Sequence, residues 1–112
     1  MLQKPVMWSE AEEAKRCEYW DFAQANIAPR AGDFERAEAV PEDVISLLAS
    51  QGLLGSLVGT EYGGPGCSFL EFGFLNEALG AACSSVRTLL TVHSMVCQAV
   101  TRWGTHAQKS RY

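Results

Sequence analysis

The sequence predicts an all-α domain: a four-helix, up-down-like orthogonal bundle followed by the beginning of a fifth helix. Three observations support this fold class. Apolar residues recur at helical spacing along most of the chain, capping patterns stand where segments begin, and the only strand-like run, residues 53–58, is interrupted by glycine. With 112 residues and no internal repeat, the chain has the size of one domain, residues 1–112.

The first helix is expected to begin after Ser9, because Ser9 and Glu12 have the spacing of a capping box. One face of this helix then carries Tyr19, Phe22, Ala23, Asn26 and Ile27. Pro29 and Gly32 are expected to end the helix, and the charged residues 33–40 are expected to form a connector.

The second helix is expected to begin with Pro41, since proline suits the first position of a helix, and to end at Gly52. Its buried stripe consists of Val44, Leu47 and Leu48. Residues 55–67 contain five glycines and Pro65, a composition that predicts a loop.

The third helix is predicted from the capping box of Ser68 and Glu71 to the break at Cys83, and the fourth from there to Gly104. The fourth carries apolar groups on almost every side, and such a helix must be covered all round. One small domain covers one face, so we expect a part of a longer protein on the other. The fifth helix, which begins after Thr105, is expected to be cut short at residue 112.

The predicted core draws on apolar residues of all four helices. Its members are Phe22, Ile27, Val44, Leu47, Leu48, Leu75, Leu79, Leu89 and Leu90.

Composition narrows the class of protein. The net charge is -4 and no run of Lys or Arg exists, which argues against nucleic-acid binding. The cysteines, Cys17, Cys67, Cys83 and Cys97, form no metal-binding pattern and are expected to be reduced thiols. The N-terminus resembles no signal peptide, and no apolar run is long enough for a membrane span. We therefore expect a cytoplasmic protein with no nucleic-acid or membrane partner.

Two patterns have a functional and a structural interpretation. The glycine loop, residues 59–66, precedes a helix as phosphate-binding loops do, but it lacks their Lys-Ser or Lys-Thr, so a plain turn is favoured. His93 and Cys97 lie four residues apart on one helix face, yet a third metal ligand is not evident. We expect His93 to be a hydrogen-bonded packing residue and predict no metal site.

Arg87 belongs to a polar stripe on the otherwise apolar fourth helix, together with Thr91, Ser94 and Gln98. One interpretation is that the stripe faces solvent. The other is a pocket wall, apolar with a few directed polar groups, in which the planar guanidinium grips a carboxylate. Spacing alone favours neither.

Four segments, in order and across nearly the whole chain, resemble the N-terminal domain of the acyl-CoA dehydrogenase family. Residues 27–31 read Ile-Ala-Pro-Arg-Ala, and residues 51–55 read Gln-Gly-Leu-Leu-Gly. Residues 61–66 match the family's Glu-Tyr-Gly-Gly-x-Gly loop, and residues 104–112 match its Gly-Thr-x-x-Gln-Lys-x-x-Tyr motif.

This resemblance implies a function for the complete protein. Members have a helical N-terminal domain, a middle β-barrel domain and a C-terminal helical bundle, and they bind FAD. A carboxylate takes the α proton of an acyl thioester, and the flavin accepts the β hydride. The base and most of the FAD site lie downstream in the family, so we expect no catalytic residue here and assign no cofactor-binding residue. The helix over residues 85–95 is implied to form one wall of the acyl pocket, through Arg87, Thr88, Thr91, Val92 and Met95.

Residues 85–88, Ser-Val-Arg-Thr, are similar to the Ser-Tyr-Arg-Ser pattern of glutaryl-CoA dehydrogenases, whose arginine holds the distal carboxylate. A second branch acts in polyketide extender-unit biosynthesis on acyl groups of acyl carrier protein. The implied partners are therefore an acyl thioester of coenzyme A or carrier protein, an unidentified electron acceptor and further copies in a homo-oligomer. The alternative is a free-standing helical protein-interaction module without catalysis.

Overall fold

The computed structural model describes residues 7–112, and within them the fold is all-helical, as predicted. The α-helices are α1 (Glu10–Asn26), α2 (Ala31–Ala37), α3 (Glu42–Ser50), α4 (Phe69–Ala82), α5 (Ser84–Trp103) and α6 (His106–Arg111). Three single turns of 3-10 helix are η1 (Ala28–Arg30), η2 (Leu53–Gly55) and η3 (Thr60–Tyr62). In the described chain no helix is long and apolar enough to cross a membrane.

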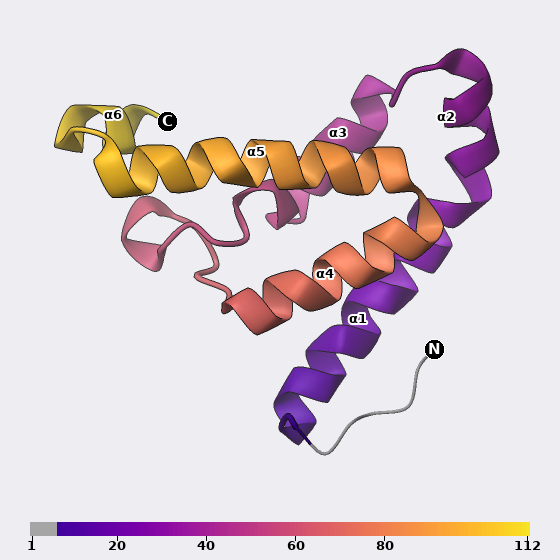
Figure 1. Cartoon of the computed structure of the whole chain (residues 1–112), viewed down its shortest axis with the longest axis horizontal. Coiled ribbons are helices and arrows are strands. Elements are labelled where there is room, and N and C mark those ends of the chain that lie inside the picture. The colour runs from indigo at the N-terminus through magenta and orange to yellow at the C-terminus, as the bar shows by residue number, and fades with distance from the viewer. Residues whose placement is uncertain (1–6) are drawn as a thin grey trace.

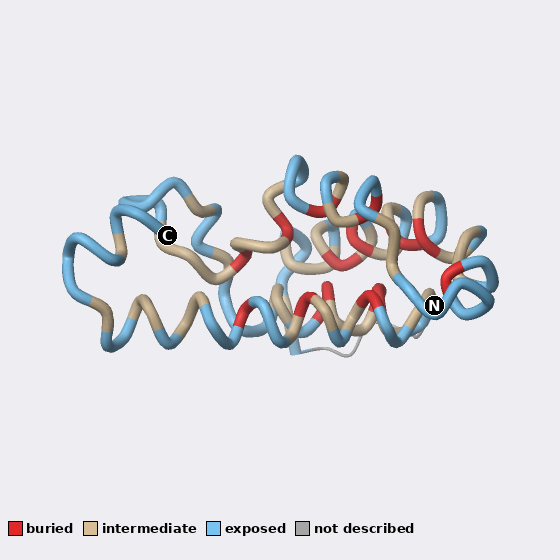
Figure 2. The backbone as a smooth tube through the Cα atoms, turned by 90° about the horizontal axis from the view of Figure 1, so that it is seen from above, coloured by how far each residue is buried: buried red, intermediate tan, exposed pale blue. Residues whose placement is uncertain are grey.

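Helices α4 and α5 form a hairpin, and the other helices pack behind it (Figure 1). α1 crosses α4, while η2 packs against α5. Seen from above, the buried residues concentrate where these elements overlap, and the far end of α5 with α6 is mostly exposed (Figure 2). The core therefore occupies one end of the molecule, and α5 extends out of it.

The helix starts follow the predicted caps. The hydroxyls of Ser9, Ser68 and Thr105 each accept a hydrogen bond from the backbone N–H three residues on, at 3.2 Å, and complete capping boxes form at all three sites. The extended backbone of Cys83 separates α4 from α5. Gly52, with φ of +72°, ends α3 in the left-handed conformation that glycine adopts without strain.

The predicted connector over residues 33–40 is wrong, because residues 31–37 form α2. Pro29 lies in the first turn of η1, where its missing N–H needs no helical partner, so the chain continues in helical form. α2 is held in place by Phe34, which is only 4% exposed. One buried aromatic side chain thus holds α2 against the core. The charged residues around Phe34 made this segment resemble a connector in the sequence.

Most of the predicted core is confirmed. Ile27, Val44, Leu48, Leu75, Leu79 and Leu90 are fully buried. Phe22 and Leu89 are only partly buried against this cluster. Leu47 is half-buried because Val44 and Leu48, one turn apart, take the inward face of α3 and leave Leu47 at its edge.

An ion pair between a buried arginine and a partly buried glutamate joins α1 to α4. Arg16 is 3% exposed, and its Nε and Nη2 donate to the two carboxylate oxygens of Glu77 at 3.1 and 2.9 Å. Arg16 also lies 3.6 Å from the carboxylate of Glu13 and stacks over the Trp8 ring. This fork-to-fork geometry satisfies a charge that has been removed from water.

We predict that Glu77→Ala lowers the free energy of unfolding by about 3 kcal/mol, since it leaves the buried Arg16 guanidinium with an incomplete partner set. The measurement is urea denaturation monitored by far-UV circular dichroism. The control is Asp43→Ala, which breaks the exposed pair between Arg30 and Asp43, whose side chains are 40% and 64% exposed. That change should cost much less, because an exposed ion pair contributes little to stability. Equal losses for the two variants would contradict the structural role of the pair between Arg16 and Glu77.

Candidate functional site

Helix α5 has one buried face and one uncovered face. Val86, Leu90 and Ser94 point into the core. The opposite side exposes Val92, Met95, Val96 and Trp103, which are 55–74% exposed. The apolar side that the sequence predicts is therefore present, and no residue of the described chain covers it.

Arg87 and Thr88 lie in the first turns of α5, beside the end of α4. The Arg87 side chain is half-buried, and its Nη2 lies 3.5 Å from Thr88 Oγ1. Thr88 itself donates to the carbonyl of Ser84 at 2.9 Å and is exposed. The hydroxyl is thus engaged with its own helix, and the guanidinium remains available on the α4 side.

Thr91 is fixed to α4 rather than directed away from the domain. Its hydroxyl lies 3.0 Å from Asn76 Oδ1 and 2.9 Å from the Arg87 carbonyl, and Asn76 in turn donates to the carbonyl of Phe72 at 2.8 Å. Arg87 and Thr91 therefore border α4, whereas Thr88, Val92 and Met95 lie exposed. The five residues of the predicted wall span two adjoining surfaces of α5.

The polar stripe on α5 does not simply face solvent. Ser94 is 4% exposed, and its hydroxyl has no hydrogen-bond partner within residues 7–112. Thr91 is half-buried against α4, and Gln98 is also half-buried. The stripe therefore runs along the boundary between the buried face and the uncovered face.

Arg87 differs from Arg16 and Arg30 in its surroundings. Arg16 and Arg30 each pair with a carboxylate at hydrogen-bonding distance. No carboxylate of the described residues lies within 4.0 Å of the Arg87 guanidinium. A half-buried cation without a carboxylate is suited to an anionic ligand, because a bidentate carboxylate restores the interactions lost with water.

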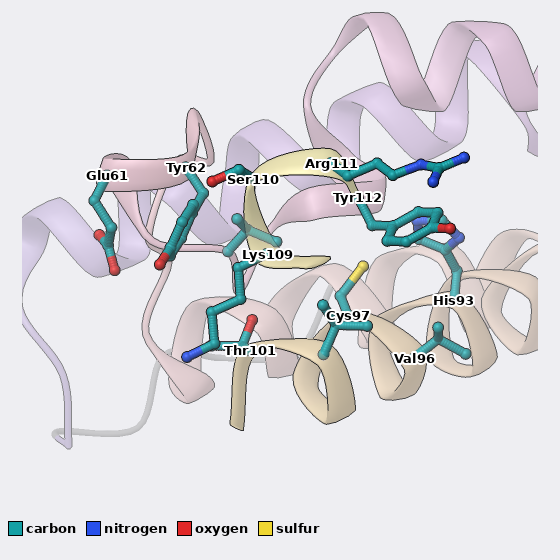
Figure 3. Close-up of a pocket in the computed structure, with 12 residues that line it drawn as sticks. Glu61, Tyr62, His93, Val96, Cys97, Thr101, Lys109, Ser110, Arg111 and Tyr112 are labelled. Carbon is teal, nitrogen blue, oxygen red and sulfur yellow. The ribbon is translucent and has the colours of Figure 1, made fainter. Parts of the chain in front are cut away.

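A groove of about 770 Å³ lies on the other flank of α5, between that helix, the glycine loop and α6. Tyr62, Tyr112, Val96 and Val100 give it apolar walls, and His93 and Cys97 face it from α5 (Figure 3). The predicted packing role of His93 is wrong: its side chain is exposed because it faces the groove and not the core, into which its neighbours Leu90 and Ser94 point. Burial raises the pKa of the Cys97 thiol, which therefore stays protonated near neutral pH.

The groove does not form a metal site from the described residues. Within residues 7–112 no three His, Cys, Asp or Glu side chains come together in a way that could hold a metal ion. The four cysteines are free thiols.

The glycine loop is a turn that uses its own amides. Gly63 donates to the Thr60 carbonyl, Gly64 to the Gly59 carbonyl and Gly66 to the Val58 carbonyl, at 2.9–3.1 Å. These three hydrogen bonds close the loop on its own backbone. The loop therefore has the form of a turn held by its own backbone, in agreement with the predicted plain turn.

The end of the loop is attached to α1. Cys67 Sγ lies 3.6 Å from the hydroxyl of Tyr19, a residue that is almost fully buried. Burial, followed by the contact with Cys67, raises the pKa of the Tyr19 phenol above its ordinary value. Sequence reasoning assigned Tyr19 to the buried face of the first helix but gave no sign of its partner, which is 48 residues away.

Comparison with known proteins identifies a family pattern over most of the chain. Residues 9–112 match the model of the acyl-CoA dehydrogenase N-terminal domain. The chain is 38% identical over 94 residues to the mitochondrial isovaleryl-CoA dehydrogenase of Solanum tuberosum, covering 81% of the chain and 23% of that protein.

Two further relatives differ in their named reactions. The mitochondrial isobutyryl-CoA dehydrogenase of Bos taurus is 30% identical over 92 residues, covering 82% of the chain and 22% of the relative. An NADH-dependent acryloyl-CoA reductase of Anaerotignum propionicum is 30% identical over 91 residues, covering 81% of the chain and 23% of the relative. The chain thus spans less than a quarter of the length of each of these relatives.

We predict that Gly64→Ala lowers the free energy of unfolding by more than about 2 kcal/mol. A β-carbon at this position would lie 2.1 Å from the Val58 carbonyl oxygen, so the backbone must move and break loop hydrogen bonds. Gly73→Ala in α4 is the control, since a β-carbon there meets nothing within 4 Å. Chemical denaturation should show the control unchanged or slightly stabilised, and a tolerated Gly64→Ala would contradict the observed loop.

We further predict that the protein loses stability as pH rises above about 10, the ordinary pKa of tyrosine. The unfolded chain releases the Tyr19 proton there while the folded chain retains it, so the unfolded state binds fewer protons and is favoured by up to about 1.4 kcal/mol per pH unit. Denaturation midpoints between pH 9 and 12 measure this slope. Tyr19→Phe should flatten it, and an identical slope in that variant would show that other groups are responsible.

Proposed function

The chain belongs to the acyl-CoA dehydrogenase family, as its N-terminal domain, and we propose that it serves a flavin-dependent acyl thioester dehydrogenase by supplying one wall of the acyl pocket. The observation that carries this proposal is the uncovered side of α5, where apolar side chains stand beside a half-buried arginine. Such a surface has the composition of a ligand pocket wall, mostly apolar with a few directed polar groups.

The proposed wall consists of Arg87, Thr88, Thr91, Val92 and Met95. Val92 and Met95 offer apolar contact to an acyl chain, since both are exposed on α5. Arg87 offers a planar, permanently charged fork, and no carboxylate of the described chain occupies it. The hydrogen bond between Thr91 and Asn76 holds this part of α5 against α4.

We propose a short acyl group with a polar end as the substrate, either carboxylated or hydroxylated, carried by coenzyme A or by acyl carrier protein. Arg87 has no carboxylate partner in the described chain, and this supports an acyl group with a polar end. In a wholly apolar pocket the desolvation of the guanidinium would not be offset by any interaction with the ligand. A place in polyketide extender-unit biosynthesis agrees with such a substrate. The three relatives named above carry isobutyryl-CoA, isovaleryl-CoA and acryloyl-CoA in their names, so the proposed acyl group departs from theirs.

We propose FAD as the cofactor, bound by residues outside the described part of the chain. The glycine loop is closed by its own backbone hydrogen bonds and lacks the Lys-Ser or Lys-Thr of phosphate-binding loops. No step of the reaction is therefore assigned to residues 7–112, whose role is to bind and orient the acyl group. We also propose that the complete enzyme is cytoplasmic and forms a homo-oligomer.

The exposed side of α5 also favours a second candidate, a helical protein-interaction module. Trp103 and Val96 are large, exposed and on the same side of the helix, as in surfaces that bind a partner helix. Sedimentation and thermal unfolding of the 112-residue chain alone distinguish the two candidates. Soluble, cooperative folding favours the module, whereas aggregation or a molten state favours a domain that needs the rest of an enzyme.

We predict that Arg87→Met in the complete enzyme lowers kcat/KM for glutaryl-CoA by about 10–100-fold, because it removes a charge-assisted contact of about 1.5–3 kcal/mol. Oxidation of butyryl-CoA should be unchanged or faster, since an unpaired cation is removed from its pocket. Steady-state kinetics with both thioesters measures the two values.

The matched control is Arg102→Met, which removes an exposed cation from the other end of the same helix. It should alter neither substrate's kcat/KM by more than about twofold. If Arg87→Met lowers both substrates equally, the arginine is structural and the polar-acyl proposal is wrong.

A further inference from the structure

Gly80 is a glycine in the last turns of α4 whose backbone does not require glycine. The glycines with positive φ in the described chain are Gly52, Gly63 and Gly66, and Gly80 is not among them. Within a helix, glycine is less favourable than any other residue except proline. Its presence at this position therefore calls for a reason in the surroundings.

The surroundings of Gly80 are filled by Arg87. A β-carbon built on Gly80 would lie 3.1 Å from Arg87 Cδ, 3.8 Å from Cγ and 3.9 Å from Nε. All three of its nearest neighbours thus belong to one side chain, which crosses α4 where a side chain of residue 80 would stand. Gly73, in the same helix, has nothing within 4 Å of its β-carbon position.

The path over Gly80 determines where the guanidinium emerges. Packing of the aliphatic part against bare backbone restricts the rotamers of a long side chain, which reduces the entropy lost on binding a ligand. The guanidinium at the end of this path has Thr88 Oγ1 at 3.5 Å as its hydrogen-bonding neighbour. It meets no carboxylate of residues 7–112.

We propose that Gly80 is a positioning residue for substrate recognition: its missing side chain seats Arg87 across α4 and directs the guanidinium at a carboxylate on the distal end of the acyl group. This inference rests on the proposed function for the identity of the ligand. The seating of Arg87 by Gly80 is a property of the fold and can be tested without any substrate.

The first experiment observes Arg87 directly by ¹H–¹⁵N spectroscopy of arginine Nε–Hε groups in the protein. The Arg87 resonance is assigned by its loss in Arg87→Met. In Gly80→Ala and, more strongly, in Gly80→Leu the resonance should shift, because the new side chain displaces the arginine stem. Gly73→Ala and Gly73→Leu are the controls, which make the same chemical change at an open position of α4 and should leave the resonance in place.

The second experiment measures steady-state kinetics of the same variants in the complete enzyme with glutaryl-CoA and butyryl-CoA. Gly80→Leu should raise KM for glutaryl-CoA about 10-fold or more with a smaller change in kcat, and Gly80→Ala should have a weaker effect in the same direction. Both thioesters should keep their wild-type kinetics in the Gly73 variants, whereas in the Gly80 variants KM for butyryl-CoA should change less than KM for glutaryl-CoA.

The outcomes separate the two proposals. An unmoved Arg87 resonance in both Gly80 variants overturns the positioning role, whatever the enzyme oxidises. A moved resonance with unequal loss for the two thioesters supports it. If the resonance shifts but activity with the two thioesters falls equally, Gly80 positions Arg87 and the ligand is not a carboxylate. The same conclusion follows if Arg87→Met affects both thioesters equally, and either result overturns the polar-acyl proposal.

Discussion

The position of α4 between α1 and α5 is the constraint on which the rest of this structure depends. Its inward side chains, Phe74, Leu75, Ala78 and Leu79, are all buried. Polar contacts then fix its rotation from both sides: Glu77 holds Arg16 of α1, and Asn76 receives Thr91 of α5. Because neighbouring positions of one helix reach both partners, a rotation of α4 would break the ion pair and the amide contact together.

Because α4 is packed in the core and also contacts Arg87 and Thr91, it holds part of the candidate site in place. Arg87 and Thr91 lie on α5, but the Arg87 side chain passes over Gly80 of α4 and the Thr91 hydroxyl contacts Asn76 of the same helix. The other flank of α5 has no such support, since His93 and Cys97 face a groove bordered by the glycine loop and α6. A single helix therefore presents one surface held by the core and another that depends on less tightly packed segments (Figure 2).

Local signals in the sequence were sufficient for most of the fold. Capping boxes at Ser9, Ser68 and Thr105 and the break at Cys83 are determined by residues within a few positions of one another, so they could be read from spacing. The same spacing could not reveal the pairing of Arg16 with Glu77, which are 61 residues apart, or the contact between Tyr19 and Cys67. Helix α2 was missed for a related reason, since the burial of Phe34 depends on distant packing and not on its charged neighbours.

The candidate site shows the same limit more sharply. The residue types on α5 indicated an apolar wall with a cation, yet they left the direction of the polar stripe open, because a helical wheel cannot say which flank meets another helix. The structure resolves this through α4: Thr91 is bound to it, and Ser94 is buried. Arg16 and Arg87 illustrate two different environments of an arginine. Both side chains are partly or fully buried. Arg16 forms a bidentate pair with a carboxylate, whereas Arg87 only packs its aliphatic stem against Gly80. Because an unpaired, partly desolvated charge lowers stability, this difference in surroundings is the basis of our proposal that Arg87 pairs with an anion from outside the domain.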